Sequence, residues 1–254
     1  MTSLEVTGLQ GLPLVKAGDD LGELIASAIE RSGVAPRAQD VLVVAQKIVS
    51  KAEGRVVALA TVEPSDRALK LAAEVDKDPR LVELILSESV RVVRARRGVL
   101  IVEHTLGFIM ANAGVDQSNV APGDGASCAL LLPKNPDASA EALRRGLKAL
   151  TGIDIAVVIN DSFGRPWRKG TAGVAIGAAG LPALIDLRGR PDLFGRKLEV
   201  SVIGFADEIA AAASLLMGQA DEALPAVLIR GLSWSASEST AAGLVRPSNE
   251  DLFR

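Results

Sequence analysis

Apolar and polar positions along the chain follow two periods, one typical of helices and one typical of strands. Apolar residues at helical spacing, several of them behind a capping residue, are found in five segments: 21–33, 64–75, 78–88, 139–150 and 207–217. Runs rich in Val, Ile and Leu predict strands at 40–49, 90–94, 99–104, 126–132, 153–159, 184–187, 198–205 and 226–232. The last twenty residues are polar and predict an irregular arm or tail.

The order of these segments indicates the fold class. Two of the predicted strands flank Arg96-Arg97-Gly98, which is a hairpin signal, and helices do not alternate strictly with strands. This order predicts an α+β fold with mixed, largely antiparallel sheets rather than a doubly wound parallel sheet. With 254 residues the chain is long enough for one large domain or two closely packed lobes, and it contains no repeat and no flexible linker.

Composition narrows the classes of function. The net charge of −3 argues against nonspecific nucleic-acid binding, which needs many cations to neutralise phosphates. One cysteine and one histidine exclude a Cys/His zinc site and argue against a Cys–His catalytic pair. Cys128 lies in an apolar run and is expected on a buried strand, whereas His104, at the end of a predicted strand, is expected to be a hydrogen-bonded structural histidine.

Neither a signal peptide nor a membrane span is predicted. The first residues lack both the basic and the apolar region of a signal sequence, and no run approaches the roughly 20 apolar residues of a spanning helix. A cytoplasmic enzyme in a reducing compartment, with no membrane or nucleic-acid partner, is the expectation.

Two polar segments stand out because each follows an apolar run and carries an acid. Asp116 lies in Ala-Asn-Ala-Gly-Val-Asp-Gln-Ser-Asn (111–119), and Asp161 is followed by Ser162 in Asn-Asp-Ser-Phe-Gly-Arg-Pro-Trp-Arg-Lys-Gly (160–170). Carboxylate, amide and hydroxyl oxygens are the ligands that Mg²⁺ or Mn²⁺ prefers. The alternative is that these acids only cap helices or form turns, as Asp and Asn at strand ends usually do.

Basic residues accompany the acids. Arg165, Arg168 and Lys169 could bind a phosphate or a substrate carboxylate, and the alternative is a solvated basic loop. Lys47 and Lys51 follow an apolar strand, where a lysine can reach a phosphate or simply be solvated.

No standard nucleotide motif is present. The chain lacks both G-x-x-x-x-G-K-[ST] and G-x-G-x-x-G. The glycine-rich segment 173–180 has the wrong spacing for a dinucleotide turn and is expected to allow close backbone packing. Gln219 follows the helix stop at Gly218 and could face a cation or merely end the helix.

Taken together, the segments resemble the coenzyme F420-0:L-glutamate ligase (CofE) family. The similarity runs from about Gly11 to Gly231. It rests on blocks in the family's order: Gly-Leu-Pro-Leu (11–14), Val-Ser-Lys-Ala-Glu-Gly (49–54), the 111–119 block, Leu-Leu-Pro (131–133), Gly-Arg-Pro-Trp-Arg (164–168), Leu-Arg-Gly (187–189), Ala-Asp-Glu (206–208) and Met-Gly (217–218).

The resemblance implies a reaction and a fold. Such proteins use GTP and a divalent cation to join L-glutamate to a carboxylate of the deazaflavin F420-0, releasing GDP and phosphate, and they can extend a γ-glutamyl tail. The implied fold is an unusual two-lobed α+β arrangement that forms an intertwined homodimer. Some relatives carry a C-terminal flavin-binding domain, and the length of this chain predicts a single ligase unit without one.

The resemblance also implies roles for individual residues. Lys51, Arg165 and Arg168 are expected to be catalytic. The residues expected to contact the nucleotide are Leu12, Pro13, Leu14, Val15, Gln46, Lys47, Lys51, Asn119 and Gln219. Those expected to bind Mg²⁺ or Mn²⁺, with K⁺ as a further candidate cation, are Asp116, Asp161, Ser162 and Gln219.

Two other classes of function remain open from the sequence. A related acid–amine ligase with a different acceptor would keep the dependence on nucleotide and metal. A non-catalytic protein that binds deazaflavin or nucleotide would bind its ligand without releasing phosphate.

Overall fold

The computed structural model describes residues 3–120, 127–235 and 239–251. Its helices are α1 (Leu21–Arg31), α2 (Gln46–Ala52), α3 (Asp66–Val75), α4 (Pro79–Ser87), α5 (Pro136–Thr151) and α6 (Phe205–Met217). Short 3₁₀ turns are η1 (Leu59–Thr61), η2 (Asn112–Gly114), η3 (Ala241–Leu244) and η4 (Ser248–Glu250). The strands are β1 (Glu5–Gly8), β2 (Val41–Ala45), β3 (Val56–Ala58), β4 (Ser89–Arg96), β5 (Val99–His104), β6 (Ile109–Ala111), β7 (Cys128–Leu130), β8 (Ala156–Arg165), β9 (Arg168–Ala179), β10 (Ile185–Asp186), β11 (Val202–Ile203) and β12 (Ala226–Arg230).

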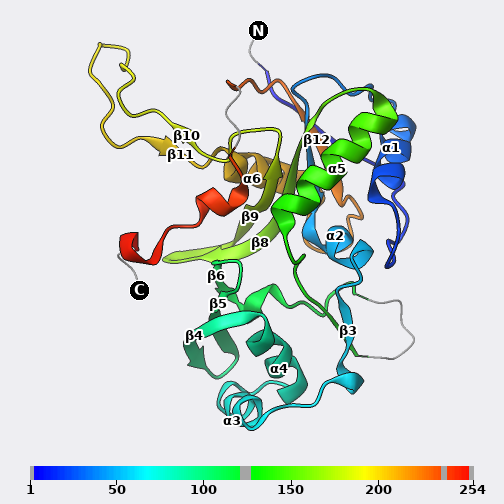
Figure 1. Ribbon diagram of the computed structural model, residues 1–254, viewed down its shortest axis with the longest axis vertical. Helices are drawn as coiled ribbons and strands as arrows, with labels where there is room; N and C mark the ends of the chain where they lie inside the picture. The colour runs from blue at the N-terminus through cyan, green and yellow to red at the C-terminus, as the bar shows by residue number, and fades with distance from the viewer. Residues whose placement is uncertain (1–2, 121–126, 236–238, 252–254) are drawn as a thin grey trace.

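A five-stranded sheet with the order β1-β12-β2-β8-β9 forms the larger part of the molecule (Figure 1). Only the β2–β8 pair is parallel, and the other three pairs are antiparallel. Helices α1, α2 and α5 pack on one face, while α6 packs on the other. Because both faces are covered, the central strands are almost wholly apolar: all of Val41–Val44 is buried.

A second group of elements has its own core. The three-stranded sheet β4-β5-β6 packs against α3 and α4, and all of these elements lie below the larger sheet in Figure 1. Leu100 and Val102 point into this core from β5, where buried and half-buried positions alternate. The predicted α+β class with mixed, mostly antiparallel sheets is therefore confirmed.

An arm formed by β10, β11 and the chain between them extends away from the larger sheet (Figure 1). Its outer loop carries Leu193 and Phe194, which are 98% and 96% exposed.

The segment 46–49 is helical, so the prediction of a strand through residue 49 was wrong. The strand ends at Ala45, and α2 begins at Gln46. The Ser50 hydroxyl donates to Gln46 Oε1 at 2.9 Å, one helical turn back, and Ile48 and Val49 are buried. Polar residues spaced by four stabilise a helix here despite the β-branched pair.

The segment after residue 159 also differs from the prediction. Strand β8 continues to Arg165 and forms a hairpin with β9, so Asp161 and Ser162 lie within a strand and not in an irregular loop. The glycine-rich segment is strand β9, and its expected close packing is confirmed. A Cβ added at Gly173 would meet the Ser214 side chain and the Ala210 carbonyl of α6.

Smaller differences concern the ends of elements. Of the predicted strand 198–205 only Val202–Ile203 is extended, and Phe205 already begins α6. Strand β7 is shorter than the predicted 126–132, whose first residue lies outside the described residues, and Cys128 is half-buried rather than buried. Within the described ranges, no helix has the length and apolar character needed to cross a bilayer.

Candidate functional site

Asp116 is held in place by its own turn and by strand β7. It exchanges two backbone hydrogen bonds with Leu130. Its carboxylate accepts hydrogen bonds from the Ser118 amide at 2.7 Å and the Ser118 hydroxyl at 3.0 Å. An aspartate followed two residues later by such a donor forms an Asx turn, which fixes the direction of the carboxylate.

Two lysines from α2 face this turn. Lys47 Nζ lies 2.7 Å from Asp116 Oδ2 and donates to the Ser118 hydroxyl at 2.8 Å. Lys51 Nζ, four residues along the same helix, donates to the Asn119 carbonyl at 2.6 Å. The spacing of four places both lysines on one face of α2, so a helix brings together what the predicted strand would have separated.

Asp161 enters the cluster from strand β8. Burial, assisted by the negative charge of Asp116, raises the pKa of Asp161 to about 7. Burial also pushes the pKa of Asp116 upward, but hydrogen bonds from Lys47 and Ser118 outweigh it and leave that pKa below its ordinary value. Asp116 is therefore ion-paired with Lys47, whereas Asp161 feels the charges of both residues but forms no ion pair among the described residues.

Ser162 and Gln219 form a second polar contact nearby. The Ser162 hydroxyl donates to Gln219 Oε1 at 2.8 Å. The loop that carries Gln219 is tied to the first cluster, because the Asn119 side-chain amide donates to the Ala220 carbonyl at 3.1 Å. Successive strand residues point to opposite faces, so Asp161 and Ser162 leave β8 in different directions.

The donor atoms in this region suit a hard cation. Among the described residues no group of three or more His, Cys, Asp and Glu side chains gathers. The two acids, the Ser162 hydroxyl and the Gln219 amide oxygen are all oxygen donors, as Mg²⁺ and Mn²⁺ prefer. Asp161 is half-buried, and its raised pKa marks a poorly solvated carboxylate whose negative charge a cation would compensate.

The three basic residues of the 160–170 segment lie farther along the β8–β9 hairpin. Arg165 ends β8, and Arg168 and Lys169 begin β9, all three exposed around the turn. Trp167 at the turn has a positive φ of 58° and is 80% exposed. Lys51 has a different environment, because burial and the charge of Lys47 lower its pKa.

The expected nucleotide-contacting residues fall into two groups. Asn119, Lys47, Lys51 and Gln219 lie in the linked network just described. Gln46 is buried with its side chain bound to Ser50. In the 12–15 segment, Val15 is buried in the core, Leu12 packs against it, and Leu14 is 77% exposed.

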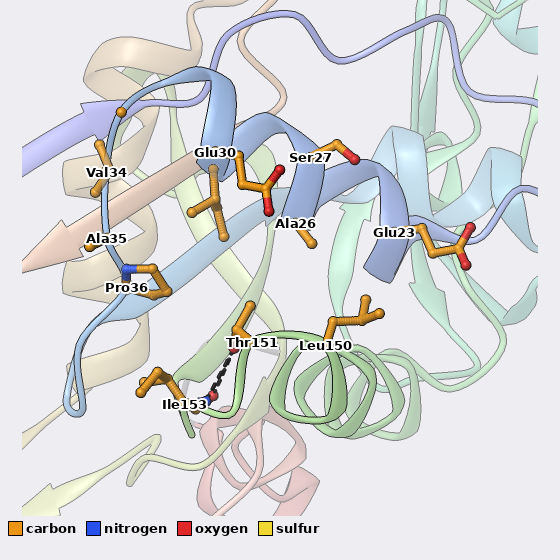
Figure 2. A pocket seen from close by; sticks show the side chains of 12 residues that line it. Glu23, Ala26, Ser27, Glu30, Val34, Ala35, Pro36, Leu150, Thr151 and Ile153 are labelled. Carbon is orange, nitrogen blue, oxygen red and sulfur yellow. Dashed lines mark hydrogen bonds between the residues drawn. The ribbon is translucent and has the colours of Figure 1, made fainter.

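A separate hollow lies away from these residues. It has a volume of about 860 Å³ and is formed by α1, residues 33–36 and the end of α5 (Figure 2). Glu23 and Glu30 line it, and no lysine or arginine does. None of the residues expected in the site lines it, and acidic walls do not suit a nucleotide.

Ser118 is a residue of the candidate site to which the sequence gave no role of its own. It lies in the polar 111–119 block and joins Lys47 to Asp116. The spacing Asp-x-Ser, which is typical of an Asx turn, was the available signal. His104, in contrast, is the buried structural residue that was expected, with Nδ1 accepting from the Leu106 amide at 2.9 Å.

Comparison with known proteins supplies an independent result. Residues 11–231 match the family described as F420-0:Gamma-glutamyl ligase. A protein of Methanothermobacter thermautotrophicus named coenzyme F420:L-glutamate ligase is 47% identical over 253 residues, covering 99% of each chain. Proteins with the same name from Methanopyrus kandleri, covering 100% of each chain, and Archaeoglobus fulgidus, covering 99% of this chain and 96% of its own, are each 44% identical.

Proposed function

Because the chain belongs to the F420-0:gamma-glutamyl ligase family, we propose that it joins L-glutamate to coenzyme F420-0 through an amide bond. GTP is the proposed co-substrate, and GDP and phosphate are the proposed by-products. The product carries one glutamyl unit, and further units can be added to give a γ-glutamyl tail.

The observation that carries the proposal is the Lys47–Asp116–Asp161 cluster. Two acids and two lysines converge from α2, the 116–119 turn and β8, and these are the groups needed to hold a metal-bound phosphate. Catalysis of phosphoryl transfer depends on positioning and charge neutralisation and needs no covalent nucleophile.

The proposed chemistry has two steps. A carboxylate oxygen of F420-0 attacks the γ-phosphorus of GTP, and the bond to the β-phosphate oxygen breaks to release GDP. The glutamate amine then attacks the carbonyl carbon of the acyl phosphate, loses a proton and expels phosphate. Lys47 and Lys51 bind and orient phosphate oxygens during these steps.

A divalent cation, Mg²⁺ or Mn²⁺, would be held by Asp116 and Asp161. Ser162 and Gln219, whose side chains meet on the other face of β8, are proposed as a separate pair of oxygen donors. The divalent cation would supply charge neutralisation at the phosphates. K⁺ is a further candidate for the same oxygen-rich region.

The other expected residues are proposed as substrate contacts. Leu12, Pro13, Leu14 and Val15 form a mostly apolar segment proposed to contact guanine, and exposed Leu14 is free to do so. Gln46, in the first turn of α2, is proposed to contact the nucleotide. Arg165 and Arg168 at the hairpin turn are proposed to hold anionic groups of F420-0 or glutamate during the reaction.

We also propose two lobes and an intertwined homodimer. The separate core around β5, α3 and α4 supports the two lobes. The projecting arm with exposed Leu193 and Phe194 supports the dimer, because such a tip is stabilised when a second chain covers it.

Isotope transfer tests the proposed chemistry. F420-0 labelled with oxygen-18 in its reacting carboxylate, incubated with GTP and L-glutamate, should yield phosphate that carries the label. Unlabelled phosphate alongside glutamylated product would refute the acyl phosphate. Phosphate release without glutamylated product would favour a different acceptor, and ligand binding without phosphate release would favour the non-catalytic alternative.

A further inference from the structure

A second, smaller hollow lies beside the proposed site. It has a volume of about 200 Å³ and is bounded by the turn into β6, strand β9, the first turn of α6 and residues 244–246. Its apolar wall includes Phe108, Ile109 and Val174. Two charged side chains, Asp207 and Arg246, line it as well, so it presents one charge of each sign beside an apolar surface.

Asp207 has a single hydrogen bond and no ion pair to compensate its charge among the described residues. Its Oδ1 accepts a hydrogen bond from the Ala175 amide at 2.9 Å. Burial raises its pKa, with only the Ala175 hydrogen bond opposing the rise. A half-buried carboxylate that lines a cavity and forms no ion pair among the described residues is suited to bind a positively charged group.

The hollow is close to the proposed reaction centre. Val174 is the direct partner of Asp161 in the β8–β9 ladder, so their side chains lie on the same face. Asp207 bonds to the amide that follows Val174. Standard backbone dimensions then place the Asp207 carboxylate within ~11 Å of the Asp161 Cα. Phe108 also contacts Phe163 of β8, with ring centroids 5.8 Å apart.

We propose that this hollow binds the amino-acid substrate, L-glutamate, as a zwitterion. Asp207 pairs with its ammonium group and Arg246 with one of its carboxylates, while its methylene groups contact Phe108 and Val174. The inference rests on the proposed ligase function and assigns the amino-acid subsite within it. Arg246 is exposed, with one long contact from Nη1 to the Glu250 carbonyl at 3.5 Å, so its guanidinium can turn towards a ligand.

The competing explanation is that Asp207 only caps the edge of the sheet. Asp137 provides the comparison, because its carboxylate accepts from the Ala178 amide of the same edge strand and from the Ala241 and Ala242 amides. Asp137 does not line the hollow. A capping role predicts similar behaviour for both aspartates, whereas a binding role separates them.

The test uses Asp207→Asn, which keeps an oxygen acceptor for the Ala175 amide and removes the charge. We expect the KM for L-glutamate to rise at least ~10-fold, the strength of a charge-assisted hydrogen bond, with the KM for GTP unchanged. Arg246→Ala should raise the same KM, and the matched control Asp137→Asn should not. An unchanged KM for L-glutamate in active, folded Asp207→Asn would overturn the proposal.

A binding measurement separates this proposal from the ligase function. Calorimetry with L-glutamate, in the presence of GDP and Mg²⁺, should give a Kd for the full-length wild-type protein that is at least ~10-fold lower than for Asp207→Asn. Glutarate, which lacks the amine, should bind both proteins equally. Equal binding of L-glutamate to both proteins, or none to the wild type, would reject the hollow as the subsite. Wild-type protein that binds L-glutamate through Asp207 yet forms no product would reject the ligase function alone.

Discussion

Asp161 makes the stability of the metal-free protein depend on pH in a direction that is unusual for an acid. Its pKa of about 7 in the folded protein lies well above the ~3.9 of an aspartate in an unfolded chain. Between these values the folded state holds a proton that the unfolded state has released. The free energy of unfolding must therefore fall as pH rises through this window.

The size of the effect follows from linkage. Between pH 5 and pH 8 the Asp161 term should lower the free energy of unfolding by about 2.5 kcal/mol, most of it lost before pH 7. Asp116 has the opposite sign, because its depressed pKa gives stability that is lost only as pH falls through its folded pKa, below this window. Substituting Asp161→Asn removes the Asp161 term and leaves an uncharged side chain of similar size.

Urea unfolding in the presence of a chelator, at pH 5, 6, 7 and 8, would measure this term. The wild type minus Asp161→Asn difference cancels other titrating groups, including buried His104, whose pKa burial lowers. We expect that difference to fall by about 2.5 kcal/mol across the range. A difference independent of pH would refute the reasoning that Asp161 is poorly solvated beside another negative charge.

The same proton competes with a cation. Because a metal-binding carboxylate must be deprotonated, Mg²⁺ affinity should weaken about tenfold from pH 8 to pH 6. Calorimetric titration of Mg²⁺ at these two values measures the ratio. Equal affinities would indicate that Asp161 does not bind the cation.

Three further changes have defined outcomes. Gly173→Ala should lower the free energy of unfolding in urea by about 1–3 kcal/mol, because its Cβ meets the Ala210 carbonyl, whereas Gly164→Ala, with open space around it, should not. Asp40→Asn should lower the free energy of unfolding by at least about 1.5 kcal/mol in the same assay, because Arg230 loses an ion pair at 2.7 Å with a carboxylate that is only 2% exposed. As a control, Asp76→Asn should leave the free energy of unfolding nearly unchanged, because the Arg97–Asp76 pair is exposed. Arg168→Ala should raise the KM for F420-0 or L-glutamate, while Arg145→Ala, 72% exposed on α5, should leave steady-state kinetics unchanged.

The sequence predicted best the elements in which local pattern and tertiary packing agree. The helix at 21–31 has its capping residue, Asp20, and its buried stripe of Ile25 and Ile29 where periodicity placed them. The apolar runs of β2 and β12 are buried on both faces of the sheet, and such runs need no alternation to be recognised.

The site was predicted less completely, because its geometry depends on two elements whose type was misassigned. Ile48 and Val49 favour a strand locally, but their burial under the sheet and the Gln46–Ser50 bond stabilise a helix. Only that helix brings Lys47 and Lys51 within one turn of each other, because in an extended strand residues four apart would lie about 13 Å apart. Similarly, Asp161 was expected in a loop, and its raised pKa follows from its position within a packed hairpin.

Spacing alone also could not identify contacts between distant segments. The Ser162–Gln219 hydrogen bond joins residues 57 positions apart, and Lys47 reaches Ser118 across 71. Such pairs depend on the order of strands in the sheet, which no local pattern contains. The family resemblance supplied Lys47, Ser162 and Gln219 together but not Ser118, and its assignment of the family is confirmed.

The mass of the product is the measurement to make first. Purified protein incubated with F420-0, L-glutamate, GTP and Mg²⁺ should convert F420-0 to a product heavier by one or more glutamyl units, with one GDP for each unit added. Folded Asp161→Asn should lose most of this conversion. A folded wild-type protein that binds GTP yet leaves the mass of F420-0 unchanged would contradict the proposed function.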